Sequence, residues 1–403
     1  MAGSPHADFK VAVVGAGPAG LTAALALATA GVETVLISKS ASAVDKRTTA
    51  LLTGSVYALD ALGVWQFCRN HAAPLTAIRI VDDTSRLLRA PEVRFEAAEI
   101  GLDAFGQNIE NRNLVSALEK RTQELSLARI EDTAQTIEIG ANYVTITLAG
   151  GGTVKAALVV GADGRRSLCR EAAGIETENR TYQQSALTLN VTHARPHNSI
   201  STEFHTESGP FTFVPLPGDR SSLVWVMAHE EAANLKTLDE RELSDAIEHQ
   251  AHSFLGRIEA EPGSGLYPLA TQRARRLGAN RVALVGEAAH VLPPIGAQGL
   301  NLGLRDAATI AELVASADRD GNDVGAPALL GEYDERRRAD IVSRTMAIDL
   351  LNRSLLTDFL PVQGVRGLGL YLLDRIGPLR RALMREGVTP ATSEPRLMRG
   401  EAL

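Results

Sequence analysis

The stretch that most constrains the fold runs from residue 281 to 308 and reads RVALVGEAAHVLPPIGAQGLNLGLRDAA. Its apolar start, Val282–Val285, is short enough to be a buried strand. A loop rich in proline and glycine follows, and from Leu300 apolar residues recur at helical spacing. The first N–H groups of a helix have no internal partner and lie at the positive end of its dipole. The stretch therefore predicts a site for a group that carries or develops negative charge.

A second glycine-rich turn lies near the N-terminus, in the run GAGPAG from Gly15 to Gly20. It follows a predicted strand at 10–14 and opens a predicted helix that ends near residue 30, with another strand at 32–37. In such a fingerprint Gly15 makes the tight turn, Gly17 lets the backbone approach a pyrophosphate, and Gly20 allows close packing. The setting favours dinucleotide binding over a glycine turn without a ligand.

A third motif is ALVVGADGRRSLCR, residues 157–170. The predicted strand delivers Asp163 and Gly164 into a turn, where the carboxylate can accept hydrogen bonds that order the turn. A generic Asp-Gly turn is the alternative interpretation.

Taken in order, the three motifs resemble those of class A FAD-dependent aromatic monooxygenases, the para-hydroxybenzoate hydroxylase-like group. The segment HVLPPIGAQGLNLGLRDAA most resembles the ubiquinone-biosynthesis hydroxylase family. The resemblance implies an α/β fold: a doubly wound FAD/NAD(P)-binding domain, an inserted mixed β-sheet substrate domain and a helical C-terminus. The expected division is 1–75, 102–180 and 276–340 for the FAD domain, 76–101 and 181–275 for the substrate domain, and 341–403 for the C-terminal helices.

The resemblance also implies which residues bind FAD. Arg47, in the segment DKRTTAL, and Arg112, in a helix predicted over Ile109–Leu118 (IENRNLVSAL), correspond to arginines near the cofactor, although either could be a surface charge. The full set of expected FAD-binding residues is Gly15, Gly17, Ala19, Gly20, Ser38, Arg47, Arg112, Asp163, Gly164, Gly286, Glu287, Gly296, Gly299, Leu300 and Asn301.

Two of these residues depart from the family pattern. Ser38 stands where an acidic residue usually binds the adenosine ribose, and Glu287 stands where the family has aspartate. A hydrogen bond from a neutral hydroxyl is roughly half as strong as one to a carboxylate. We therefore expect weaker FAD binding, partly offset if Lys39 reaches a phosphate.

Other residues are candidates for substrate binding and catalysis. The stretch GPFTFVPLP places Phe211, Phe213 and Leu216 as candidate substrate contacts, although alternating aromatic residues are more often core. The backbone at Pro293 and Pro294 is expected to shape the reaction pocket. His290 is a candidate proton relay, and a histidine that braces the loop is the alternative.

Composition excludes several classes. With 403 residues the chain is long enough for two or more domains, and a formal charge of −7 argues against a nucleic-acid surface. Two cysteines provide no disulfide framework or metal cluster, so we expect no metal and a cytoplasmic protein. The arginine-rich C-terminal helices either pack on the protein or dock peripherally on a membrane or a biosynthetic complex. The oligomeric state is left open.

The resemblance implies hydroxylation of the aromatic ring of a polyprenylated phenol in ubiquinone biosynthesis, through a flavin C4a-hydroperoxide. The co-substrates are O₂ and NAD(P)H, which visits transiently because the chain has no second fingerprint. Three alternatives remain: a small-phenol hydroxylase, a polyprenyl reductase of the same fold, and a flavin-poor scaffold protein.

Overall fold

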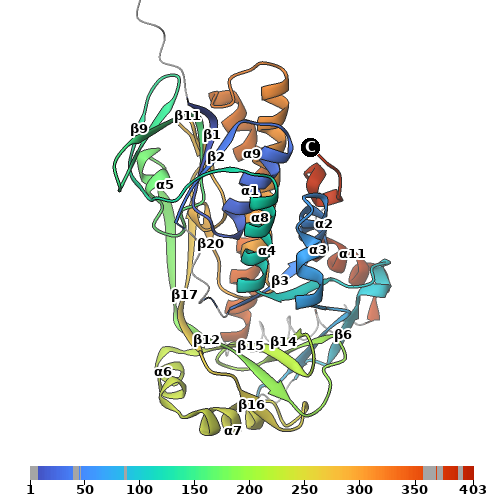
Figure 1. Ribbon diagram of the computed structural model, residues 1–403. Helices are drawn as coiled ribbons and strands as arrows, with labels where there is room; N and C mark the ends of the chain where they lie inside the picture. Colours follow the sequence, from blue (N-terminus) through green and yellow to red (C-terminus); the bar gives the residue numbers. More distant parts are fainter. Residues whose placement is uncertain are drawn as a thin grey trace, which may run out of the picture.

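The computed structural model describes residues 8–39, 45, 47–85, 89–356, 369, 375–388 and 394–403. Two large sheets organise these residues, one near each end of the molecule (Figure 1). This α/β arrangement, with mixed sheets and helices near the C-terminus, confirms the predicted fold class.

The first sheet has eight strands in the order β18-β19-β11-β1-β2-β8, with β10 and β9 added beside β11. Its parallel centre forms because apolar strands are covered on both faces. The strands are β1 (Phe9–Val14), β2 (Thr34–Ile37), β8 (Ala128–Ile130), β9 (Ala134–Ile139), β10 (Val144–Leu148), β11 (Thr153–Gly161), β18 (Gly278–Ala279) and β19 (Val282–Leu284).

Helix α1 (Pro18–Thr29) packs beside this sheet against α8 (Gln298–Arg319) and α4 (Asn111–Glu124). Its alanines and leucines are buried almost all round, which is typical of a helix at the centre of a protein. Helix α9 (Pro327–Leu356) packs on α8, and the short α5 (Leu168–Ala172) follows β11.

The second sheet has nine strands in the order β20-β17-β12-β15-β14-β13-β5-β6, with β16 beside β12. The long strands β12 and β17 run from the first sheet to the second (Figure 1). Helices α6 (His229–Thr237) and α7 (Glu240–Gln250) cover one of its faces. Its strands are β5 (Ala77–Asp82), β6 (Val93–Glu96), β12 (Thr177–His193), β13 (Ile200–His205), β14 (Pro210–Leu216), β15 (Arg220–Ala228), β16 (Ile258–Ala260), β17 (Gly265–Ala274) and β20 (His290–Val291).

A three-stranded sheet lies between the two large ones, in the order β3-β7-β4. It consists of β3 (Thr48–Leu52), β4 (Ala72–Pro74) and β7 (Gly106–Glu110), with α2 (Thr53–Ala61) and α3 (Trp65–Cys68) following β3. Strand β7 also contacts β14 of the second sheet, so it connects the two halves.

Two expectations about helices need correction. The helix predicted from Ile109 begins at Asn111, because Ile109 and Glu110 pair with β3 in the small sheet. The division drawn at residues 340 and 341 falls inside α9, which is continuous from Pro327 to Leu356. Apolar periodicity did not reveal either boundary, since strand pairing and helix packing decide them.

Near the C-terminus, α11 (Gly377–Val388) packs Met384 and Val388 against Phe95 and Phe105 beside the second sheet. The same helix leaves Leu379 and Leu383 about half exposed. Within the described part of the chain, no helix is both long and apolar enough to span a bilayer.

Candidate functional site

The three glycine-rich segments meet at the carboxyl end of the first sheet. Gly15 adopts a φ of +110°, and a Cβ built on it would lie 2.3 Å from the carbonyl oxygen of Ala162. A Cβ on Gly20 would lie 2.1 Å from the carbonyl oxygen of Gly15. On the other side, Gly286 contacts Ala19, and Gly303 of α8 contacts Gly286. These close approaches require glycine, so the fingerprint turn, the DG turn and the loop after β19 form one unit.

Four of the predicted cofactor glycines face open space. A Cβ on Gly17, Gly164, Gly296 or Gly299 would meet no atom within 4 Å. Helices α1 and α8 both begin without a side-chain cap and without an acidic residue in the first turn. Their first N–H groups are therefore available to an anionic ligand, and open space beside the glycines fits a dinucleotide.

The DG turn is held by its own side chains. Asp163 accepts hydrogen bonds from the Ser167 hydroxyl at 2.5 Å and from the Cys169 amide at 3.0 Å. Arg170 donates from Nη1 to the carbonyl of Ala288 at 2.9 Å. The turn that presents Gly164 is thus fixed to the loop that carries Gly286 and Glu287.

Arg47 lies beside this unit. Asp45 accepts from its Nε and Nη2, and the guanidinium lies 5.6 Å from the centroid of the Tyr267 ring. Glu287 is exposed, and its negative charge favours the protonated form of Arg47. The hydrogen bonds and charge of Asp45 raise the pKa of Arg47, with Tyr267 and Glu287 adding to the effect. Arg47 is therefore a fixed cation at the junction of the two sheets.

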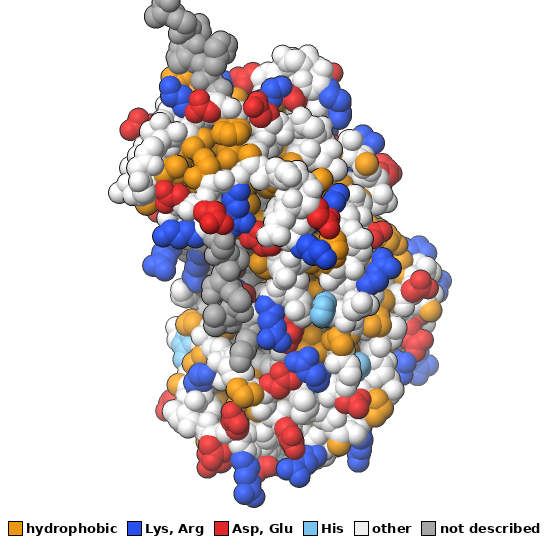
Figure 2. Space-filling model, in the orientation of Figure 1, with side chains coloured by type: hydrophobic (Ala, Val, Ile, Leu, Met, Phe, Trp, Pro, Cys, Tyr) orange, Lys and Arg blue, Asp and Glu red, His pale blue; other side chains and the backbone are white. Residues whose placement is uncertain are grey.

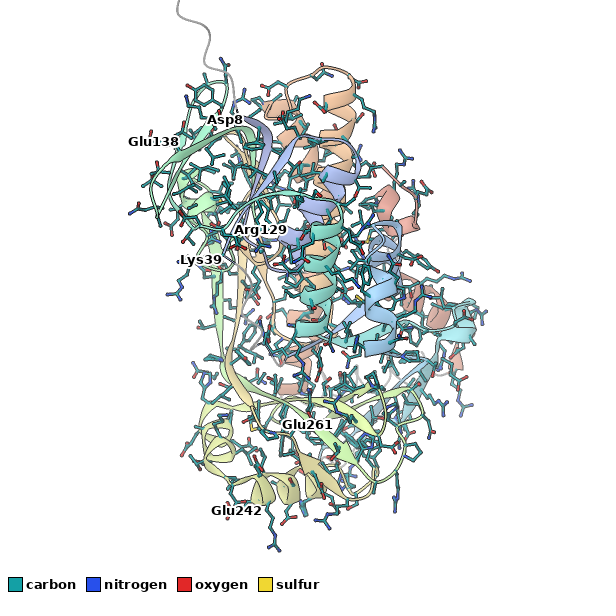
Figure 3. The ribbon with its side chains drawn as sticks, viewed as in Figure 1. Asp8, Lys39, Arg129, Glu138, Glu242 and Glu261 are labelled. Atoms are coloured by element: carbon teal, nitrogen blue, oxygen red, sulfur yellow. The ribbon has the colours of Figure 1, made fainter. Side chains whose placement is uncertain are left out.

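Arg112 lies at a polar cavity of about 300 Å³. The carboxylate of Glu110, at the end of β7, accepts from Arg112 at 2.7 Å, from Asn190 at 3.0 Å and from Arg220 at 3.2 Å. Burial alone would raise the pKa of Glu110, but the two arginines lower it. Glu261 completes the network with a bond to Arg220 (Figure 3). Sequence analysis identified only Arg112, because these residues are far apart along the chain.

The His290 side chain is buried and does not face the open space beside the cofactor glycines. Its ring is 2% exposed, and Nε2 lies 2.7 Å from Asp306 of α8. Asp306 also accepts from the amide of Gly286 at 3.2 Å and from Arg337 of α9 at 2.8 Å. Burial would raise the pKa of Asp306, but the charges of His290 and Arg337 lower it. The histidine therefore braces the loop, and the structure does not support the proposed proton relay.

Asp306 is a functional residue that sequence analysis passed over. It lies on the apolar face of α8, between Leu304 and Ala307, where a charged side chain must have a partner. An acidic residue at a core position of an amphipathic helix was the available signal. Its partner Arg337 is one of three consecutive arginines, and the sequence alone does not show which of them is buried.

Asn301 and Leu300 lie in the first turns of α8. The Asn301 side chain is 1% exposed, accepts from the amide of Leu52 and the hydroxyl of Ser55, and donates to the carbonyls of Ala50 and Ala297. It therefore holds β3 and α2 to α8, and its side chain has no capacity left for a cofactor. Leu300 is half-buried.

Ser38 directly follows β2, and its hydroxyl donates to the carbonyl of Lys39 at 2.8 Å. Lys39 lies close to Arg129 at the ends of β2 and β8 (Figure 3). Arg129 is paired with Glu119 at 2.5 Å. In this structure the Ser38 hydroxyl bonds to its own chain, so a bond to a ribose would have to replace that contact.

The predicted substrate contacts Phe211 and Phe213 lie elsewhere. They are 0% and 1% exposed and pack with Phe204 and Trp225 beneath α6 and α7. The structure thus contradicts their assignment to a substrate pocket, because period-two alternation does not say which face of a sheet is covered by helices. Leu216 is also fully buried.

The other face of the second sheet contacts the proline-rich loop. Ile295, between Pro294 and Gly296, packs in an apolar cluster with Ala186, Val226 and Leu269 of the sheet and Ile348 of α9. Pro293 is buried, its carbonyl accepts from the amide of Ile295 at 2.7 Å, and Pro294 is exposed. The loop is thus a rigid link between the glycine-rich unit and an apolar wall.

The comparisons with known proteins agree with this geometry. A protein-family model described as "FAD binding domain" matches residues 8–347. The chain belongs to this FAD-binding family of flavin-dependent aromatic monooxygenases. It is 37% identical to ubiquinone hydroxylase UbiL of Rhodospirillum rubrum, covering 100% of this chain and 95% of the relative. It is 29% identical to 3-demethoxyubiquinol 3-hydroxylase of Escherichia coli, covering 93% and 97%.

Solved structures of similar fold include p-nitrophenol 4-monooxygenase PnpA from Pseudomonas putida DLL-E4. It has a TM-score of 0.74 and 19% identity, covering 96% of this chain and 99% of that one. Klebsiella pneumoniae HpxO complexed with FAD has a TM-score of 0.73 and 18% identity, covering 95% and 99%. As a member of this flavin monooxygenase family the protein is an enzyme, and its cofactor is FAD. The predicted family and cofactor are thereby confirmed.

Proposed function

We propose that this flavin monooxygenase hydroxylates the aromatic ring of a polyprenylated phenol during ubiquinone biosynthesis. The observation that carries the proposal is an apolar wall on which Val224 of the sheet and Leu292 of the loop are only half-buried, packed on Ala186, Val226 and Leu269 beside the glycines expected to bind FAD. Such a wall suits an apolar ring substrate. Two full-length relatives are named as hydroxylases of ubiquinone or its precursor, which supports the same substrate class.

The proposed FAD contacts fall into two groups, one for the pyrophosphate and one for the flavin ring. Gly17 and the N-terminus of α1 would hold the pyrophosphate, since backbone N–H groups and open space meet there. The bare N-terminus of α8, with Gly296 and Gly299, would face the flavin ring. Arg47 would lie as a cation between the cofactor and Tyr267. The Asn301 side chain is left out of this set because its bonds are all made within the protein.

FAD supplies the redox chemistry, accepting hydride from NAD(P)H and activating O₂. The chain supplies position and a dry environment. The buried Pro293 and Ile295 fix the loop, and the apolar wall limits the access of water and stray protons to the reaction. NAD(P)H would act as a transient co-substrate.

Oxygen uptake by the FAD-loaded protein tests the proposal. We expect NAD(P)H oxidation to be slow alone and to accelerate with a polyprenylated phenol, with hydroxylated product formed. A matched phenol without the prenyl tail is the control. Equal stimulation by the two would favour a small-phenol hydroxylase, and saturation of prenyl double bonds without O₂ uptake would favour a reductase.

We also propose that α11 docks peripherally on an anionic membrane surface. Ile376, Leu379 and Leu383 are 43–49% exposed, and Arg381 and Arg385 belong to the same helix. Apolar side chains with adjacent arginines suit the interface of an anionic bilayer. The face viewed in Figure 2 has acidic and basic side chains interspersed.

Sedimentation with vesicles tests this docking. We expect the protein to bind vesicles containing anionic lipid and the double variant Leu379→Ser, Leu383→Ser to bind at least tenfold more weakly. The control is Tyr57→Ser, at an exposed apolar residue of α2. No binding by the wild type, or equal binding by the variant, would refute the proposal.

A further inference from the structure

The second sheet carries an unexplained pair of ionisable side chains, Glu203 and His205 of β13. Nε2 of His205 lies 2.8 Å from Oε1 of Glu203, and the hydroxyl of Thr212 donates to Oε2 at 3.2 Å. The His205 side chain is 4% exposed and that of Glu203 is 17% exposed. Burying such groups is costly unless they are paired, and nothing in the family assignment above uses them.

The strand register shows which face of the sheet the pair occupies. Glu203 is opposite Thr212, Thr212 is opposite Val224, and Val224 is opposite Thr188. Side chains directly opposite in adjacent strands lie on the same face. Val224 packs against the cluster that contains Ile295, so Glu203 belongs to the face that meets the proline-rich loop.

The pair does not belong to the aromatic core on the opposite face of the sheet, which α6 and α7 cover. Phe204, between Glu203 and His205, packs with Phe211, Phe213 and Trp225 under α6 and α7. Successive side chains of a strand point to opposite faces. Glu203 and His205 therefore point away from that aromatic core and towards the side on which the apolar wall lies.

The Glu203 carboxylate is held in its ionised form, in which it can accept hydrogen bonds. Burial alone would raise the pKa of Glu203, but His205 and Thr212 outweigh it and the pKa is lowered. An ionised carboxylate can only accept, so Nε2 of His205 is the donor of the hydrogen bond to Glu203. Nδ1 is buried without a hydrogen-bond partner among the described residues. A carboxylate held in this way has lone pairs on Oε2 beyond the one that Thr212 uses.

The geometry points to Glu203 as the residue that recognises the ring hydroxyl of the substrate, accepting its hydrogen bond at Oε2. This inference rests on the proposed ring hydroxylation. The ring would lie against the half-buried Val224, and the hydroxyl would point along the sheet to β13. A carboxylate that accepts this hydrogen bond increases the negative charge on the ring oxygen, and the oxygen donates that electron density into the ring, which makes the ring a better nucleophile. His205 acts as a positioning residue, because its Nε2–H fixes the carboxylate.

Ligand binding to the FAD-loaded protein tests the inference without turnover. The probes are a prenylated phenol and its methyl ether, titrated while the flavin absorbance is followed. A hydrogen bond to a charged acceptor is worth about 1.5–3 kcal/mol, or roughly ten- to a hundredfold in affinity. We expect the wild type to prefer the phenol by this factor, and Glu203→Gln to lose most of the preference. His205→Gln should reduce it less.

The matched control is Glu138→Gln, at an exposed glutamate of β9 in the first sheet (Figure 3). It should keep the wild-type preference. An undiminished preference in Glu203→Gln with full flavin content would overturn the inference. A wild-type preference below twofold would overturn it even if Glu203→Gln did not fold. If no prenylated phenol binds or accelerates NAD(P)H oxidation in the wild type, the proposed function fails instead.

Discussion

The proposed cofactor-binding unit and the sheet proposed to face the substrate would achieve specificity in opposite ways. Around Gly15, Gly17 and Gly20 the protein uses backbone N–H groups and the absence of side chains. On the second sheet it uses the side chains themselves, with Val224 and Glu203 on one face and Phe211 on the other. A turn that needs glycine is local and appears as a motif in the sequence. The role of a side chain on a sheet depends instead on what covers the face to which it points. Variants can test each half of this contrast.

The largest expected effect separates two glycines of one motif. Gly20→Val would place its Cβ 2.1 Å from the carbonyl oxygen of Gly15, and we expect destabilisation on the order of 3 kcal/mol or more. Gly17→Val enters open space, so we expect a folded protein without flavin. Circular dichroism and the flavin spectrum distinguish the two results. A full flavin spectrum in Gly17→Val would show that the pyrophosphate does not approach this turn.

The buried ion network should be nearly as sensitive. Arg337→Met removes the partner of Asp306 and leaves a buried charge, so we expect a loss of roughly 3–5 kcal/mol of stability. Asp306 has a lowered pKa in the folded state. Its stabilising contribution is therefore present above the unfolded pKa of about 4 and is lost as the pH falls. Denaturant unfolding at pH 7 and at a pH well below 4 measures both effects, and the variant should show the smaller difference.

A core aromatic residue sharpens the comparison between the two sheet faces. Phe211→Ala should reduce stability by about 3–5 kcal/mol, because the ring is fully buried under α6 and α7. Selectivity among phenols should stay unchanged, since the ring does not lie on the face with Val224. Substrate competition assays provide the measurement. Altered selectivity in a folded Phe211→Ala protein would return this residue to the substrate site.

The smallest effect concerns Ser38. Its hydroxyl bonds to the carbonyl of Lys39, and no acidic side chain ends β2. Ser38→Glu would add a charge-assisted bond to the ribose, and we expect about ten- to a hundredfold tighter FAD binding. Titration of apoprotein with FAD is the test, with Ser38→Gln as the neutral control. Tight wild-type binding that Ser38→Glu does not improve would mean that other contacts replace the acid.

The sequence by itself determined the cofactor half of this protein. The glycines at 15, 17 and 20, the turn at Asp163 and Gly164, and the loop before α8 each required a backbone geometry that only a few residue types allow. Local spacing indicated a dinucleotide site, and the resemblance of the three motifs to a known family implied the fold class and FAD. The departures at Ser38 and Glu287 were visible by comparison with the pattern of that family.

Only the tertiary structure decided the substrate half. Alternation along β13 and β14 predicted two faces but not which one α6 and α7 would cover, so Phe211 was assigned to a pocket although it lies in the core, and the role proposed above for Glu203 had no local signal. The network of Glu110 and Arg220, and the brace formed by Asp306, His290 and Arg337, join residues from separate elements. Such contacts depend on how sheets and helices pack, and no local pattern in the chain encodes that packing.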